Sequence, residues 1–158
     1  MENRQNKNHR TIRVFTNKIG KFANETNIRD FSFTIDEPEK LGGTNKAPTP
    51  MEYILGSFNG CILIVIEMIA EEIHFSIDNL SAETHGILDR RGLAGTADVS
   101  PHFHQVKNTV VIETTESSES IAELKNLVKK RCPAYNLFRD AGIDIELDWK
   151  KAENLGGK

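Results

Sequence analysis

The sequence has few of the residues and patterns that mark several large classes of protein. With only two cysteines among 158 residues, it does not encode the disulfide framework of a small secreted domain. A net charge of −3 gives no electrostatic case for binding nucleic acid or an anionic membrane. The sequence also contains no phosphate-binding loop, no dinucleotide fingerprint and no Ser-His-Asp spacing. What remains is a globular protein whose chemistry must rest on other residues.

The sequence pattern predicts neither an apolar leader nor a membrane-spanning segment. The first ten residues are polar and lack the apolar core of a signal peptide, so we expect a cytoplasmic protein. There the thiols would be kept reduced, and a disulfide between them would be transient and catalytic. The longest uncharged stretch lies between Glu52 and Glu67 and has 14 residues, which is short for a membrane span. It predicts a core helix and no membrane partner.

The length fits one domain, which would bury about two-thirds of the surface of the unfolded chain. We expect a disordered arm over residues 1–10, a single domain over 11–150 and a flexible tail over 151–158. Alternation of apolar and polar residues predicts strands, with a turn at residues 17–20, a loop at 36–48 and a hairpin loop at 89–101. The predicted strands cover residues 11–17, 21–26, 29–36, 75–88, 106–115 and, as an edge strand, 143–149.

Three helices complete the prediction. Thr49, Pro50 and Glu52 form a capping box that begins a helix, which continues to about residue 72. Its apolar residues surround it on nearly all sides, so other elements should enclose most of its faces. Two further helices are expected over residues 117–131 and 133–141, separated at a proline. This order of elements predicts an α+β fold with helices against antiparallel sheet.

The two cysteines are candidates for redox chemistry because they could meet in the fold as a reactive thiol and its resolving partner. Cys61 lies in the apolar helix, where a free cysteine usually behaves as a small hydrophobic residue. A reactive thiolate there would need a cation from elsewhere in the fold or from a second subunit. Cys132 follows Lys129, Lys130 and Arg131 and is a candidate N-cap or N′ residue of the next helix. Neighbouring cations and a helix N-terminus both lower a thiol pKa. These cations could instead cap the preceding helix. Local context alone predicts Cys132 as the more acidic thiol.

Glu52, His102 and His104 are weaker candidates for a functional role. Glu52 is a candidate catalytic carboxylate, although the capping box already gives it a structural role. His102 and His104 would share one face of a strand, but a metal site needs a third and usually a fourth ligand. We therefore predict no metal site and no cofactor.

Two groups of short motifs point to a known family. The first consists of Asp36-Glu37-Pro38, Leu41-Gly42-Gly43, Ala47-Pro48-Thr49-Pro50-Met51-Glu52 and Gly60-Cys61, and the second is Cys132-Pro133-Ala134-Tyr135-Asn136. Together they resemble the OsmC/Ohr family, the osmotically inducible and organic hydroperoxide resistance proteins. The resemblance covers roughly residues 11–149. It implies an OsmC-like fold in which two chains intertwine as a homodimer, with long central helices packed against antiparallel sheets.

The resemblance also implies a two-cysteine peroxidase. Cys61 would be the peroxidatic thiol that attacks an organic hydroperoxide, and Cys132 would resolve the product to a transient disulfide. A dithiol reductant, such as a dihydrolipoyl group, would then reopen that disulfide. These roles reverse the ranking of acidity from local context, because a dimer can place a cation beside Cys61.

The sequence departs from the family at two positions that matter for activity. Peroxidase members usually carry a glutamate where this chain has Met51, and Glu52 lies one step later, about 100° around the helix. Instead of an arginine, the first hairpin offers Lys18 and Lys21, while Arg29 lies farther off. A lysine cannot reproduce the two-pronged contact of a guanidinium. This pattern is closer to the OsmC-like branch and keeps open a binding or redox-sensing protein without turnover. A thioester hydrolase, which a long helix against antiparallel sheet would also suit, has no distinctive motif here.

Overall fold

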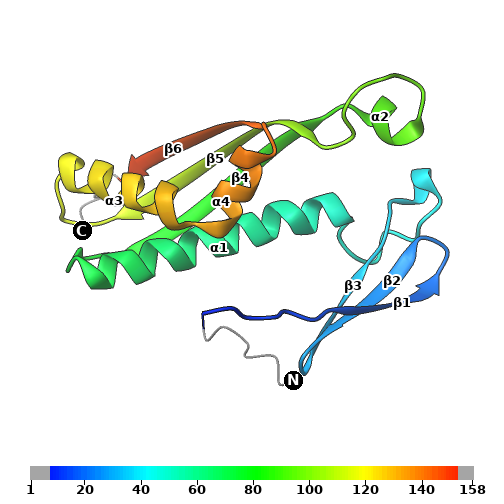
Figure 1. Cartoon of the computed structure of the whole chain (residues 1–158), viewed down its shortest axis with the longest axis horizontal. Helices are drawn as coiled ribbons and strands as arrows, with labels where there is room; N and C mark the ends of the chain where they lie inside the picture. Colours follow the sequence, from blue (N-terminus) through cyan, green and yellow to red (C-terminus); the bar gives the residue numbers. More distant parts are fainter. Residues whose placement is uncertain (1–7, 153–158) are drawn as a thin grey trace, which may run out of the picture. The chain divides into compact units, whose positions relative to one another are not determined.

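The structure, a computed structural model, describes residues 8–152. Most of the predicted arm at residues 1–10 and of the predicted tail at 151–158 therefore lies outside the described residues. The chain divides into two compact units, Met1–Tyr53 and Ile54–Lys158, with the boundary inside the longest helix (Figure 1). Both sheets and helices are present, so the predicted α+β class is confirmed.

The first unit holds a three-stranded antiparallel sheet of β1 (Phe15–Gly20), β2 (Ala23–Ile28) and β3 (Phe31–Ile35), in that order. The predicted turn at residues 17–20 is wrong. Asn17 and Lys18 pair with β2, and the chain reverses at residues 21 and 22. Asn17 and Gly20 favour a turn, but strand pairing outweighs this local preference. With the reversal at residues 21 and 22, β1 pairs with β2 from Phe15 to Gly20.

The loop that follows β3 is organised around one carboxylate. Asp36 is buried and accepts hydrogen bonds from the backbone N–H groups of Glu37, Thr44 and Lys46 and from the Thr44 hydroxyl. The Thr44 hydroxyl has the largest effect, followed by the Lys46 amide, and together these donors lower the pKa of Asp36 well below its usual range despite its burial. A short 3-10 helix, η1 (Glu39–Leu41), lies within the loop. Tyr53 closes this unit by donating its hydroxyl to the carbonyl oxygen of Thr34 at 2.7 Å.

The second unit has a three-stranded sheet in the order β4-β5-β6, formed by β4 (Asn79–Leu88), β5 (Phe103–Glu113) and β6 (Asp144–Lys151). β4 and β5 are antiparallel, whereas β6 pairs with β5 in parallel. The prediction of a purely antiparallel sheet is therefore wrong for this strand. Two helices connect β5 to β6 and return the chain to the same end of the sheet, as a parallel pair requires. The predicted hairpin loop between β4 and β5 contains a short helix, α2 (Arg90–Ala94).

The three longer helices are α1 (Pro50–Glu72), α3 (Ser118–Arg131) and α4 (Pro133–Asp140). The predicted capping box at the start of α1 is confirmed. The Thr49 amide donates to Glu52 Oε2 at 2.7 Å, and the Glu52 amide donates to Thr49 Oγ1 at 3.3 Å. This reciprocal pair satisfies two N–H groups that a helix start otherwise leaves without partners.

The core of the second unit forms where one face of α1 meets apolar side chains of β5 and α3. Its fully buried residues include Phe58, Ile62, Ile66, Ile69, Val106, Val110, Ile112, Leu124 and Val128. We predicted that other elements would enclose α1 on most of its faces. Within one chain, only one face of α1 is buried. Ile54, Ile64 and Met68 stay exposed, at 44%, 58% and 51%.

A polar contact fixes α1 against the sheet inside this apolar core. Asn108 of β5 is fully buried, and its Nδ2 donates to Thr84 Oγ1 at 2.8 Å and to Asn59 Oδ1 at 3.2 Å. The Thr84 hydroxyl also donates to Asn59 Oδ1, at 2.6 Å. Because buried polar groups are costly without partners, this cluster favours one register of α1 on β4 and β5.

By length and composition, α1 is the one helix of residues 8–152 that could cross a membrane. The core helix of a soluble protein can have the same length and composition, so these two properties alone do not identify a membrane-spanning helix.

Candidate functional site: a pair of cysteines

The structure brings the two cysteines together. Cys61 lies near the middle of α1, and Cys132 lies between α3 and α4. Their sulfur atoms are 3.7 Å apart, with the Cys132 thiol donating to Cys61 Sγ, and both thiols are free. Cys132 is fully buried, whereas Cys61 is only partly buried. Of the two, Cys61 is therefore the thiol that a small molecule can reach.

Cys132 is held by its place between two helices. Its amide donates to the carbonyl oxygen of Val128 at 2.8 Å and so belongs to the end of α3. Its sulfur accepts the N–H of Tyr135 at 3.5 Å and so caps the start of α4, as the sequence predicted. Pro133 has no N–H to satisfy and suits the first helical position. The thiol is thus fixed at a rigid corner of the chain.

The predicted acidity of Cys132 is wrong. The pKa of its thiol is raised to about 11, chiefly by burial and to a smaller extent by the neighbouring Cys61, against the opposing effect of the Tyr135 amide. The sulfur points into the core, while Lys129 and Lys130 are exposed and Arg131 pairs with a carboxylate. A helix places neighbouring side chains on different faces, so adjacency in sequence did not bring these cations to the sulfur.

Two polar contacts hold the corner that carries Cys132. The Asn136 side chain donates from Nδ2 to the carbonyl oxygens of Lys129 at 3.1 Å and Cys132 at 2.8 Å. Arg131 makes a two-pronged ion pair with Glu72 at the end of α1, including an Nη2–Oε1 contact of 2.8 Å. Sequence reasoning quoted Asn136 within a motif but gave it no role. An amide side chain one turn after a proline-broken helix is the signal that could have identified it.

The remaining predicted site residues all belong to the first unit. Glu52 is exposed and engaged in the capping box. Lys18, Lys21 and Arg29 are exposed, with the Lys21 ammonium 5.3 Å from the centre of the Phe22 ring. Their predicted support of a Cys61 thiolate stays a prediction.

His102 and His104 are not arranged as a pair of metal ligands on one strand face. His104 is in β5, but His102 precedes the strand and contacts the carbonyl oxygen of Phe103 through Nδ1 at 2.7 Å. Within residues 8–152, no group of three or more His, Cys, Asp and Glu side chains is placed to hold a metal ion.

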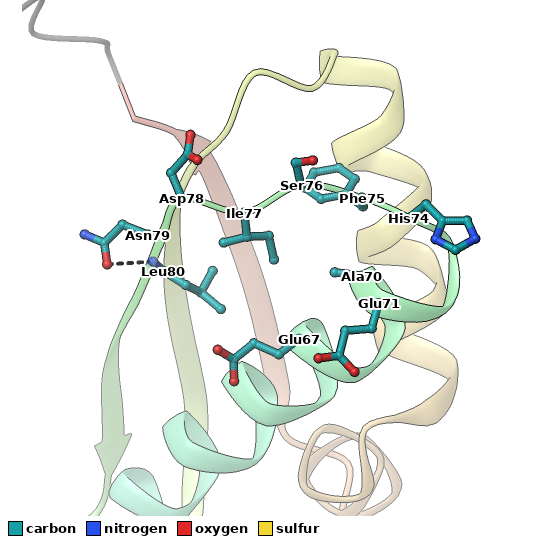
Figure 2. A pocket seen from close by; sticks show the side chains of 10 residues that line it. All are labelled: Glu67, Ala70, Glu71, His74, Phe75, Ser76, Ile77, Asp78, Asn79 and Leu80. Carbon is teal, nitrogen blue, oxygen red and sulfur yellow. Dashed lines mark hydrogen bonds between the residues drawn. The ribbon is translucent and has the colours of Figure 1, made fainter.

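A pocket of about 840 Å³ lies elsewhere in the second unit, beside the end of α1 and the segment that leads into β4 (Figure 2). Figure 2 shows Glu67 and Glu71 of α1 on one side of this space and Ile77 and Leu80 on the other. Neither cysteine lines it. The pocket is thus separate from the thiol pair.

Solved structures similar to this chain show the same fold. An OsmC-like protein from Mycoplasma pneumoniae has a TM-score of 0.80 and 18% identity over 91% of this chain and 99% of its own. An organic hydroperoxide resistance protein, OsmC, from Legionella pneumophila has a TM-score of 0.69 and 19% identity over 89% and 97% of the two chains. The organic hydroperoxide resistance protein OhrB of Bacillus subtilis has a TM-score of 0.59 and 22% identity over 89% and 98%.

At these identities the structural likeness establishes the fold alone. No curated protein sequence matches the chain. The model of the OsmC-like protein family matches residues 43–148, which is well over half of the sequence and includes both cysteines. The chain therefore belongs to the OsmC-like protein family.

Proposed function

We propose that the protein is a thiol peroxidase that reduces organic hydroperoxides in the cytoplasm, with Cys61 as the peroxidatic and Cys132 as the resolving cysteine. The observation that carries this proposal is the 3.7 Å separation of the two sulfur atoms. A disulfide requires an S–S distance of about 2 Å, so the sulfurs need to approach by less than about 2 Å. Organic hydroperoxide resistance proteins among the similar structures support the substrate class.

The first step oxidises Cys61. Its thiolate attacks one oxygen of the hydroperoxide, so an S–O bond forms as the O–O bond breaks. The alkoxide leaves and takes a proton to become an alcohol, while Cys61 becomes a sulfenic acid. Partial exposure of Cys61 gives the peroxide a route to this sulfur.

The second step forms the disulfide. Cys132 loses its proton as its sulfur attacks the sulfenic sulfur of Cys61, and the departing hydroxide takes up a proton and leaves as water. The raised pKa of Cys132 keeps it a neutral thiol at pH 7, which suits a resolving cysteine better than a peroxidatic one. An external dithiol then reduces the disulfide by exchange and becomes a disulfide itself.

Activation of Cys61 needs a nearby cation, since thiolate rather than thiol is the nucleophile. We propose Lys18, Lys21 or Arg29 for this role, from the same chain or from a partner copy, with Glu52 orienting the cation. The proposed homodimer is supported by the exposed apolar residues of α1, such as Ile64 and Met68. A second copy would cover these side chains.

The test is turnover of cumene hydroperoxide with excess dihydrolipoamide by the wild type, Cys61→Ser and Cys132→Ser. We expect Cys61→Ser to lose turnover, and Cys132→Ser to consume about one equivalent and then stop as a sulfenic acid. Trapping that sulfenic acid with dimedone identifies the peroxidatic sulfur. Equal turnover by Cys61→Ser and the wild type would overturn the proposal.

The second candidate is a redox-sensing or binding protein without turnover. Met51 at the position of the usual glutamate, and lysines in place of the hairpin arginine, favour it. A sensor would form the Cys61–Cys132 disulfide with one equivalent of peroxide, yet dihydrolipoamide would not sustain a cycle. No reaction of either thiol would instead indicate binding alone.

A further inference from the structure

A second group of charged residues lies far from both cysteines in the sequence and forms a pocket of its own in the first unit. The pocket has a volume of about 610 Å³ and is lined by His9, Arg10, Thr11, Arg13 and Arg29. All five residues are exposed, and three carry a permanent positive charge. Among residues 8–152, no acidic residue contributes to its lining. This cluster of arginines occurs in a chain whose net charge is −3.

The arginines of this pocket differ from most arginines of the second unit. Arg91, Arg131 and Arg139 each form an ion pair, with Asp89, Glu72 and Asp140. Among the ion pairs of residues 8–152, none involves Arg10, Arg13 or Arg29. Like charges that converge without a counter-charge repel one another, and a bound anion would relieve this repulsion.

The backbone at Arg29 gives a second, independent observation. Arg29 occupies the turn between β2 and β3 with φ of 56°, in the left-handed region. Tight hairpin turns usually place glycine or asparagine in this conformation, because other side chains are strained there. The guanidinium also lies over the Phe31 ring, 5.0 Å from its centre, which orients its plane. The turn thus keeps an oriented arginine at a conformational cost.

We propose that this pocket binds a phosphate-type oxyanion. The planar guanidinium presents paired N–H donors that match two oxygens of a phosphate group, and the Thr11 hydroxyl adds a further donor. The residues come from two segments, 9–13 and the β2–β3 turn, so the anion would join the start of the described chain to the first sheet. This binding involves neither cysteine, and Arg10 and Arg13 of the pocket have no part in the proposed peroxidase.

The probe is pyrophosphate, titrated into the reduced full-length protein by calorimetry at about 10 mM ionic strength, where electrostatic screening is weak. We expect saturable binding, and at least a tenfold loss of affinity in Arg13→Gln and in Arg29→Gln. Lys40→Gln is the matched control, because it removes one exposed positive charge from the same unit outside the pocket. The affinity of Lys40→Gln for pyrophosphate should stay within about twofold of the wild-type value.

Two sources of such an oxyanion are separated by a vesicle assay. Binding to phosphatidylglycerol vesicles, but not phosphatidylcholine vesicles, with competition by pyrophosphate would identify a lipid headgroup. Pyrophosphate binding without vesicle binding would identify a soluble phosphate compound.

Arg29→Gly separates a loss of pyrophosphate affinity caused by the missing guanidinium from one caused by unfolding. Glycine relaxes the turn, so we expect this variant to unfold at the same or a higher temperature while its affinity for pyrophosphate falls at least tenfold. The proposal is overturned if the wild type shows no saturable binding, or if Lys40→Gln weakens binding as much as Arg29→Gln does.

Discussion

At the scale of single residues, Cys132 combines three functions at one point of the chain. Its amide completes α3, its sulfur caps α4, and its thiol contacts Cys61 at 3.7 Å. A residue with these partners cannot rotate away from Cys61 without releasing the start of α4. The short distance between the sulfurs is therefore a property of the helix junction and not of side-chain flexibility.

The raised pKa of Cys132 predicts a loss of stability in alkali. The folded state holds the thiol proton up to about pH 11, whereas the usual value is 9.0. The folded state therefore binds the proton more tightly. This contribution is fully present below about pH 9 and is lost as the pH rises through about 11, at a cost of about 3 kcal/mol.

Urea denaturation of reduced wild type and Cys132→Ala at pH 8, 9, 10 and 11 measures this effect. We expect the free energy of unfolding to fall more steeply with pH in the wild type than in Cys132→Ala. Alkaline groups that do not contact Cys132 titrate in both proteins and cancel in the comparison. Parallel pH dependences would contradict the assignment of this loss to Cys132.

The sequence predicted the two cysteines as a pair but not the environment of each sulfur. The motifs around Cys61 and Cys132 pointed to both residues, and the proline after Cys132 correctly predicted its capping role. The direction of the Cys132 side chain follows from the packing of α3 on α1, which no local pattern encodes. For the same reason, the cations at residues 129–131 were wrongly expected to act on its sulfur.

At the scale of elements, the junction of α3 and α4 depends on Asn136. Its side chain donates to the carbonyl oxygen of Lys129, which has no helical donor because the residue four positions later is Pro133. It also adds a second donor to the carbonyl oxygen of Cys132, which already accepts the Asn136 amide. We expect Asn136→Ala to lower the free energy of unfolding by about 1–2 kcal/mol, because both oxygens lose this side-chain donor. The measurement is urea denaturation of the reduced protein.

Leu137→Ala is the matched control for this prediction. Leu137 is the next residue on α4 and is 72% exposed, so its truncation should change the free energy of unfolding by less than about 0.5 kcal/mol. Asn136→Ala should also slow disulfide formation after one equivalent of hydroperoxide, since the corner that presents Cys132 becomes looser. Unchanged stability and an unchanged rate would show that Asn136 does not hold the junction.

The elements that the sequence predicted well are those with strong local signals. The capping box of α1 and the proline between α3 and α4 act within a few residues, so the pattern was sufficient. The turn between β1 and β2 was misplaced because strand pairing outweighed the turn residues. The parallel direction of β6 depends on where two helices return the chain, which alternation of residues does not reveal.

At the scale of the whole molecule, the exposed stripe of α1 predicts self-association. Ile64 and Met68 are 58% and 51% exposed, and such apolar side chains on one helix mark an interaction surface. We expect wild type to sediment as a dimer and Ile64→Glu to shift strongly toward monomer, because the charge would be buried in the interface. Analytical ultracentrifugation over a range of concentrations measures the shift.

Ile64→Leu controls for the change of side-chain shape, and it should remain dimeric because the surface stays apolar. Circular dichroism should show that Ile64→Glu retains its helices, since an exposed substitution costs the single chain little. A monomeric wild type, or a fully dimeric Ile64→Glu, would contradict the proposed dimer.

The parallel β5–β6 pair also affects the order in which the chain acquires its structure. β6 follows β5 only after α3 and α4, so during synthesis one edge of β5 stays unpaired until both helices and β6 have been made. An open strand edge is where a second nascent chain can pair wrongly. We expect the amides of β6 to become protected last in pulsed hydrogen exchange during refolding, and protection of β6 together with β4 would contradict this order. The risk of aggregation during translation would then be greatest in the interval after β5 has been made and before β6 pairs with it.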